Sequence, residues 1–239
     1  MALQLYVGNK NYSSWSMRPW VLMKQAGIEF DEVMVRFDSF EAGSAFKRTL
    51  RGISPVGKVP VLVDGDLAVW DTLAIAETLA ERFPDKALWP LDAKQRARAR
   101  SVCAEMHSGF PALRSHCPMN IEASLPDVGR LIWRDQPAVR ADMARLGGLW
   151  GELLAAQPTR MPDGKTPLFF FIFSIPDAYF APFCMRLNTC FFFSSDPSHD
   201  LLFFHFLCRL SFTFFFSFFL FFFFFLFLFF FLLLSYLLF

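Results

Sequence analysis

Residues 54–72 read SPVGKVPVLVDGDLAVWDT, and the short segments inside this stretch decide the fold of the chain. Val59–Val63 and Leu67–Trp70 are apolar runs separated by Asp-Gly-Asp, and an Asp-Gly pair between two such runs predicts a β-hairpin. Asp71 follows the hairpin directly and is placed to cap a helix that starts at about Thr72. A hairpin that leads straight into a capped helix indicates an α/β protein.

The residues before this hairpin alternate strand and helix signals. Leu3–Val7 and Asp31–Arg36 read as strands, while apolar residues at helical spacing predict a helix over Trp15–Gly27 that a glycine ends. Phe40–Leu50 reads as a short, irregular helix. The order β-α-β-α-β-β-α therefore predicts a small α/β sandwich over residues 1–83.

The residues after position 83 change character. Residues 84–90 are a proline-bounded linker, and residues 91–188 carry only helix signals. Asp92–His116 is rich in Ala and Arg with an apolar stripe, and Pro126–Gln157 predicts one or two helices broken near an internal proline. Ser174–Asp177 (SIPD) reads as the start of a last helix, with a serine N-cap and an aspartate at the third helical position.

Residues 189–239 form a low-complexity tail. Of the 34 phenylalanines, 28 follow residue 167, and Phe, Leu, Ser and Pro fill 41 of the 50 positions from 190 onward. Residues 211–239 are uncharged and long enough to span a bilayer, so they are a transmembrane candidate. They lack the mixed apolar composition and flanking charges of natural spans, which favours read-through of C/T-rich nucleotide sequence. We therefore expect the helical part to be incomplete after about residue 188.

Bulk charge and cysteine usage exclude several function classes. The formal net charge is +1, which indicates no nucleic-acid binding. We expect no signal peptide, because no basic and apolar leader opens the sequence. The five cysteines have neither CxxC nor metal-ligand spacing, so we expect free thiols, no metal and a cytoplasmic protein, membrane-anchored only if the tail is genuine.

The sequence over residues 1–188 resembles the cytosolic glutathione transferases, and the bacterial members close to the zeta type most of all. The resemblance rests on four motifs, which are the turn NYSSWSMRPW (11–20), the hairpin stretch quoted above, SVCAEMHSGFPALR (101–114) and FSIPDAYFAP (173–182). It implies a thioredoxin-like N-terminal domain over residues 1–83 and an all-α C-terminal domain. It also implies glutathione as a substrate, a hydrophobic electrophile as the second substrate, no metal and a homodimer.

The same resemblance implies a set of residues that bind glutathione. Val59 and Pro60 are joined by a cis peptide bond that presents the Val59 backbone to the ligand. Asp71 and Thr72 bind the γ-glutamyl amino and carboxylate groups, where a plain N-cap is the alternative. Lys58 is a candidate for the glycyl carboxylate, and a solvated lysine is the alternative.

The serine turn carries the thiol chemistry in this interpretation. Ser13-Ser14-Trp15-Ser16 occupies the position of the redox CxxC of a thioredoxin-like fold, and no cysteine precedes Cys103, so dithiol exchange here is excluded. A hydroxyl can instead donate a hydrogen bond to a bound thiolate. Ser13 is the expected catalytic residue, with Ser14 and Ser16 as alternatives. Capping of the following helix by Ser14 or Ser16 is compatible with that role.

Met106, His107 and Phe110 lie on the segment expected to face a second-substrate pocket. The alternative is core packing for Met106 and Phe110 and a surface or capping role for His107.

The resulting expectation is a glutathione transferase that activates the glutathione thiol for attack on small electrophiles. A non-enzymatic binding or regulatory member and a zeta-like maleyl isomerase are the alternatives. The sequence departs from the family near Phe171, where members usually have a glycine, and at Pro176, where they tend to have alanine.

Overall fold

The structure is a computed structural model that describes residues 2–156, 168–170 and 172–191. The chain divides into two units, Met1–Ser194 and Ser195–Phe239, and every described residue lies in the first. The transmembrane candidate 211–239 and the departure at Phe171 lie outside the described residues. Among the helices that are described, none is both long and apolar enough to cross a bilayer.

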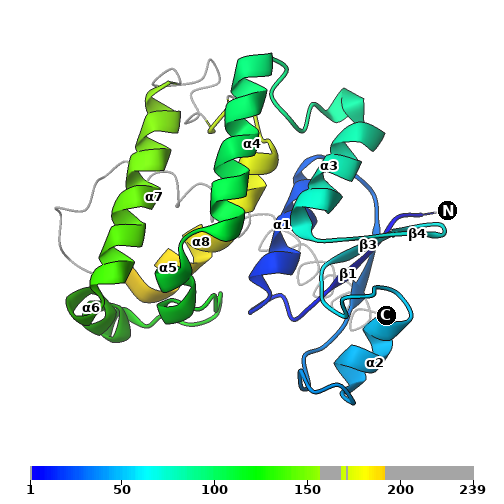
Figure 1. The fold of residues 1–239 in the computed structure, drawn as a ribbon, viewed down its shortest axis with the longest axis horizontal. Helices are drawn as coiled ribbons and strands as arrows, with labels where there is room; N and C mark the ends of the chain where they lie inside the picture. Colours follow the sequence, from blue (N-terminus) through cyan, green and yellow to red (C-terminus); the bar gives the residue numbers. More distant parts are fainter. Residues whose placement is uncertain (1, 157–167, 171, 192–239) are drawn as a thin grey trace, which may run out of the picture. The chain divides into compact units, whose positions relative to one another are not determined.

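Four strands form one mixed sheet (Figure 1), in the order β2-β1-β3-β4. They are β1 (Gln4–Val7), β2 (Asp31–Met34), β3 (Val61–Asp64) and β4 (Leu67–Trp70). β1 and β2 are parallel, and the two other pairs are antiparallel. β3 and β4 form the predicted hairpin, and Gly65 in its turn has φ 64, a left-handed value that favours glycine.

Three helices cover the two faces of this sheet. α1 (Ser14–Gln25) and α3 (Thr72–Arg82) pack together on one face, and α2 (Ala45–Arg51) lies on the other (Figure 1). Successive strand residues face opposite sides. Tyr6 of β1 accordingly packs on the cluster around Phe46 of α2, while its neighbour Leu5 is fully buried toward α1 and α3. This layering confirms the predicted thioredoxin-like arrangement.

The predicted boundaries fail at two places, and the structure gives a cause for each. α2 begins at Ala45 rather than near residue 40, because the Asp38 carboxylate accepts hydrogen bonds from the Ala45 and Phe46 amides and holds the preceding residues in a loop. The helix predicted over residues 92–116 is broken in two. Phe110 has φ 59 there, and Pro111 opens the second helix.

The second half of the described chain is helical, as predicted. It contains a short 3-10 turn (Pro84–Lys86) and the helices α4 (Ala93–Ser108), α5 (Pro111–His116), α6 (Pro126–Asp135), α7 (Pro137–Ala155) and α8 (Ile175–Phe191). α8 packs against α1, α4 and α6 (Figure 1), so it joins the sheet half to the helical half. A Cβ built on Gly129 of α6 would lie 1.6 Å from the Cys190 carbonyl oxygen, so only glycine permits the α6–α8 contact.

Asp177 holds the start of α8 from inside the protein. It is fully buried, and its carboxylate accepts hydrogen bonds from the Ser174 amide (2.9 Å), the Ser174 hydroxyl (2.8 Å) and the Phe169 amide (3.2 Å). The aspartate reaches back to the residue before the helix, as the acid of a capping box does. Burial raises the pKa of Asp177 to about 6, against the opposing effect of these donors.

We expect the Asp177→Ala variant to lose about 2–4 kcal/mol of unfolding free energy in urea unfolding, because three buried donors are left without an acceptor.

The folded-state pKa of Asp177 lies above the ordinary value of 3.8, so the folded protein binds the proton more tightly than the unfolded chain does. The wild type should therefore become less stable relative to Asp177→Asn as pH rises from about 4 to 6. Urea unfolding across this pH range measures it, and parallel curves for the two proteins would contradict the assignment.

Candidate functional site

The three hydroxyls of the serine turn all have partners, and none of them caps α1. Ser13 is the N-cap residue, but its hydroxyl makes no cap bond and instead donates to Ser16 Oγ at 2.8 Å. Ser16 Oγ also accepts from the Gly8 amide at 3.0 Å. Ser14 Oγ accepts from Arg186 Nη2 at 3.0 Å. The compatible cap by Ser14 or Ser16 does not form, because Arg186 of α8 and the Gly8 amide after β1 occupy those oxygens.

Gly8 fixes the amide that binds Ser16. A Cβ at this position would lie 2.3 Å from the Phe37 ring, so only glycine allows the ring and the turn to occupy their places together. Phe37 packs in turn on Phe46, at a ring-centroid distance of 5.2 Å. The serine turn is therefore supported by the packing on the α2 face of the sheet.

The segment before β3 offers an unpaired piece of backbone. The Val59–Pro60 peptide bond is cis, as predicted. Val59 is half-buried against the cluster around Phe46, and its amide and carbonyl form no hydrogen bond with any described residue. Lys58 is exposed and makes no ion pair within the described part of the chain.

Asp71 and Thr72 open α3 with unusual geometry. Asp71 has φ 73, a value that residues other than glycine rarely adopt, and its Oδ1 accepts from the Leu73 amide at 2.8 Å. The Asp71 N-cap is thereby confirmed. Thr72 is buried, and its hydroxyl lies beside the Tyr179 phenol without a hydrogen bond of normal geometry between them. Strained backbone and an unsatisfied buried hydroxyl are features of ligand sites.

His107 of α4 touches both parts of this region. Its Nε2 lies 3.4 Å from Asp71 Oδ2, and its ring centroid lies 5.0 Å from that of Trp15 in the serine turn. The N-terminal ends of α1 and α3 are therefore neighbours, joined by a side chain from the helical half. Met106 and Phe110 are buried, which favours the core alternative for these two residues.

Arg18 lies fully buried behind the serine turn. Its guanidinium donates to the Ser14 carbonyl (2.8 Å), the Tyr179 carbonyl (3.2 Å) and Met106 Sδ (3.2 Å), and it lies 4.3 Å from the Trp15 ring centroid. Burial, together with the smaller effects of the Arg114 and Arg186 charges, lowers the pKa of Arg18 to about 9.

Arg114 and Arg186 are two site residues that the sequence did not indicate. Arg114 follows α4 in the chain, donates to the Met106 and Gly109 carbonyls, and lies 5.0 Å from the Trp15 ring centroid. Arg186 of α8 donates to the Cys117 carbonyl at 2.7 Å as well as to Ser14. The partners of Arg186 are 69 and 172 positions away in sequence, so no local motif could have identified this residue.

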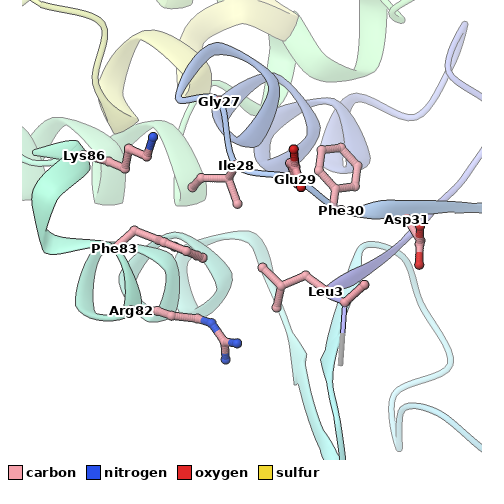
Figure 2. Close-up of a pocket in the computed structure, with 10 residues that line it drawn as sticks. Leu3, Gly27, Ile28, Glu29, Phe30, Asp31, Arg82, Phe83 and Lys86 are labelled. Carbon is pink, nitrogen blue, oxygen red and sulfur yellow. The ribbon is translucent and has the colours of Figure 1, made fainter.

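A cavity of about 410 Å³ lies elsewhere in the sheet half (Figure 2). Its lining includes Gly27, which follows α1, and Arg82 and Phe83 at the end of α3. The serine turn and Asp71 lie at the opposite ends of the same two helices. This cavity is therefore separate from the candidate site. Among the described residues, no three His, Cys, Asp or Glu side chains gather into a metal site.

Comparison with curated proteins gives partial matches to one family. Residues 12–82 match the family described as "Glutathione S-transferase, N-terminal domain". Glutathione S-transferase 1 of Dianthus caryophyllus is 31% identical over 132 residues, which cover 55% of this chain and 58% of that protein. A probable maleylacetoacetate isomerase of Caenorhabditis elegans is 33% identical over 111 residues, 46% of this chain and 49% of that protein. The chain thus spans about half the length of these relatives.

Comparison with solved structures gives the same fold. A glutathione transferase homologue from Burkholderia GL BGR1, crystallised with bound glutathione, has a TM-score of 0.54 and 24% identity and covers 82% of this chain and 83% of its own. Residues 12–82 thus match the N-terminal domain of the glutathione S-transferases, and the described fold is the one that these transferase structures share.

Proposed function

We propose that the chain is a glutathione transferase that binds glutathione across the N-terminal ends of α1 and α3 and activates its thiol for attack on a small, apolar electrophile. One observation carries the proposal. The polar groups that the family resemblance assigns to glutathione include those that the described protein leaves unpaired, namely the Val59 amide and carbonyl and the Thr72 hydroxyl. Buried or half-buried polar groups without partners favour a ligand that supplies them. The homodimer that the resemblance implies is part of the proposal.

The γ-glutamyl end of glutathione carries an ammonium and a carboxylate. The Asp71 carboxylate is exposed and suits the ammonium, while the Thr72 hydroxyl and the first amides of α3 suit the carboxylate. The first turn of α3 contains no acidic residue that would repel the carboxylate. Lys58, one residue before Val59, provides an exposed cation for the glycyl carboxylate.

Ser13 is the proposed donor to the thiolate, with Ser16 behind it. A hydroxyl hydrogen rotates freely, so the 2.8 Å contact between the two oxygens also forms when Ser16 donates to Ser13. Ser16 then still accepts from the Gly8 amide, and the Ser13 hydrogen becomes free for the ligand. This change moves protons without moving heavy atoms, so the site is organised before the thiolate forms.

The energy that thiol activation requires matches what this turn can provide. Lowering a thiol pKa from about 8.5 by two units takes about 2.7 kcal/mol of differential stabilisation. A hydrogen bond to a charged group contributes about 1.5–3 kcal/mol, and a helix N-terminus adds about 0.3–1 kcal/mol. One serine at the start of α1 is therefore sufficient in magnitude.

A zeta-like maleyl isomerase is a second candidate. The observation that favours it is the match to a probable maleylacetoacetate isomerase. Such a reaction would use the same thiolate, which adds to a carbon–carbon double bond and leaves again after rotation. A non-enzymatic glutathione-binding member is the third alternative, and it would retain the ligand without conjugating it.

We expect Ser13→Ala to lower kcat/KM for conjugation of a generic electrophile by about 100-fold, since the lost thiolate hydrogen bond corresponds to about two pKa units. Ser16→Ala should cost less, about tenfold, because Ser13 keeps its own hydrogen. Ser101→Ala is the matched control, since this exposed serine of α4 bonds only the Ala97 carbonyl. Steady-state kinetics measures all three, and wild-type kcat/KM in Ser13→Ala would contradict its role.

We expect Asp71→Asn to weaken glutathione binding by about tenfold, because the ammonium loses its carboxylate partner. The stability should change by less than about 0.5 kcal/mol, since the amide oxygen can still accept from Leu73. Asp92→Asn is the matched control, because Asp92 caps α4 in the same way through the Gln95 amide at 2.8 Å. Calorimetric titration with glutathione separates the variants, and equal dissociation constants would refute the γ-glutamyl assignment.

A further inference from the structure

Three arginines from three parts of the chain surround the serine turn. Arg18 of α1, Arg114 of α5 and Arg186 of α8, here called the arginine cluster, contact Ser14, Trp15 or both. Arg18 is fully buried, and Arg186 is 8% exposed. Among the described residues, none of the three forms an ion pair with a carboxylate. Buried charges are normally paired, so this arrangement requires an explanation.

Hydrogen bonding explains how the cluster is tolerated, but not how its charge is balanced. The guanidinium groups donate to carbonyl oxygens, to Met106 Sδ and to the Ser14 hydroxyl, and Arg186 Nε alone is buried without a partner among the described residues. These acceptors are neutral, so they satisfy donors without cancelling positive charge. Burial, with a smaller contribution from neighbouring arginines, lowers the pKa of Arg18 to about 9 and that of Arg114 to about 10. Burial also lowers the pKa of Arg186.

The titratable groups that face the cluster leave it positively charged. They are Cys103 on α4, Cys117 after α5, Asp142 on α7, and Tyr179 and Cys190 on α8. Burial raises the pKa of Cys103 and of Tyr179, which keeps both groups neutral. Asp142 acts on Arg114 alone. A hydrogen bond from Cys117 lowers the pKa of Cys190, and the Arg186 charge contributes in the same direction.

We propose that the thiolate of bound glutathione is the counter-ion of the arginine cluster, and that Arg186 acts on it through the Ser14 hydroxyl. The inference rests on the proposed function. Ser14 Oγ accepts from the Arg186 guanidinium at 3.0 Å, so its own hydrogen remains available for donation toward the ligand. A hydroxyl polarised by a cation is a stronger donor, because hydrogen bonds in a chain reinforce one another. Arg186 is thus a positioning residue that acts on the ionised thiol through the Ser14 hydroxyl.

This arrangement discriminates between two ligands that differ only at sulfur. Glutathione can place an anion beside the cluster, whereas S-methylglutathione places a neutral thioether there. Both ligands share the γ-glutamyl and glycyl groups, so contacts at Asp71, Thr72 and Val59 affect them equally. The cluster should therefore change the pKa of the bound thiol without changing the affinity for the thioether.

The test compares Arg186→Met with Arg186→Lys in the full chain. The ultraviolet absorbance of the thiolate, titrated against pH, gives the pKa of bound glutathione, and calorimetry gives the dissociation constant of S-methylglutathione. We expect Arg186→Met to raise the bound thiol pKa by about one unit, which is about a tenfold loss of thiolate below that pKa. Arg186→Lys, which keeps the charge, should raise it less. Arg98→Met is the matched control, since Arg98 is exposed and pairs with Glu152 at 3.1 Å.

Each outcome decides the question. An unchanged thiol pKa in Arg186→Met, with both ligands still bound, overturns the inference while the proposed function stands. Failure of both ligands to bind the wild type overturns the proposed function itself. If Arg186→Met does not fold, Ser14→Ala breaks the same connection without removing a buried cation. It should also raise the thiol pKa and leave S-methylglutathione affinity within about twofold, and an unchanged thiol pKa there refutes the inference equally.

Discussion

The buried guanidinium of Arg18 is the constraint on which the geometry of the serine turn depends. A cation without water requires acceptors at fixed positions, and this one takes the Ser14 carbonyl from α1 and the Tyr179 carbonyl from α8. The two helices are thereby held in one register. The sheet half supplies the helix N-termini and the Val59 backbone, while the helical half supplies His107, Arg186 and most of the positive charge.

Local signals in the sequence were sufficient for the sheet half of the fold. The Asp-Gly turn, the glycine after α1 and the aspartate before α3 each act within a few residues, so the hairpin and both helices could be predicted with their order. The same holds for the break at Pro137 and for the start of α8. The predicted start of α2 was wrong because Asp38 accepts hydrogen bonds from amides seven and eight residues further along the chain.

The candidate site was predictable only where a family motif marks it. Ser13, Val59 and Asp71 belong to such motifs, whereas Arg186 does not, and the motif that contains Arg114 gave no indication of its role. The Arg186–Ser14 hydrogen bond joins residues 172 positions apart, and no periodicity or spacing in the sequence predicts such a contact. A cap on α1 from Ser14 or Ser16 was compatible with the sequence for the same reason, since the partners of these oxygens are set by the tertiary structure.

This separation in sequence has a consequence for the order in which the protein is made. The Tyr179 carbonyl that receives Arg18 is synthesised 161 residues after it, in the last described helix. Domains generally fold from the N-terminus as the chain emerges, so the sheet can form long before α8 exists. Until α8 arrives, Arg18 and Ser14 lack their late partners and the turn remains open to water. Maturation of the serine turn is therefore a late event of biosynthesis, although its residues are among the first to be made.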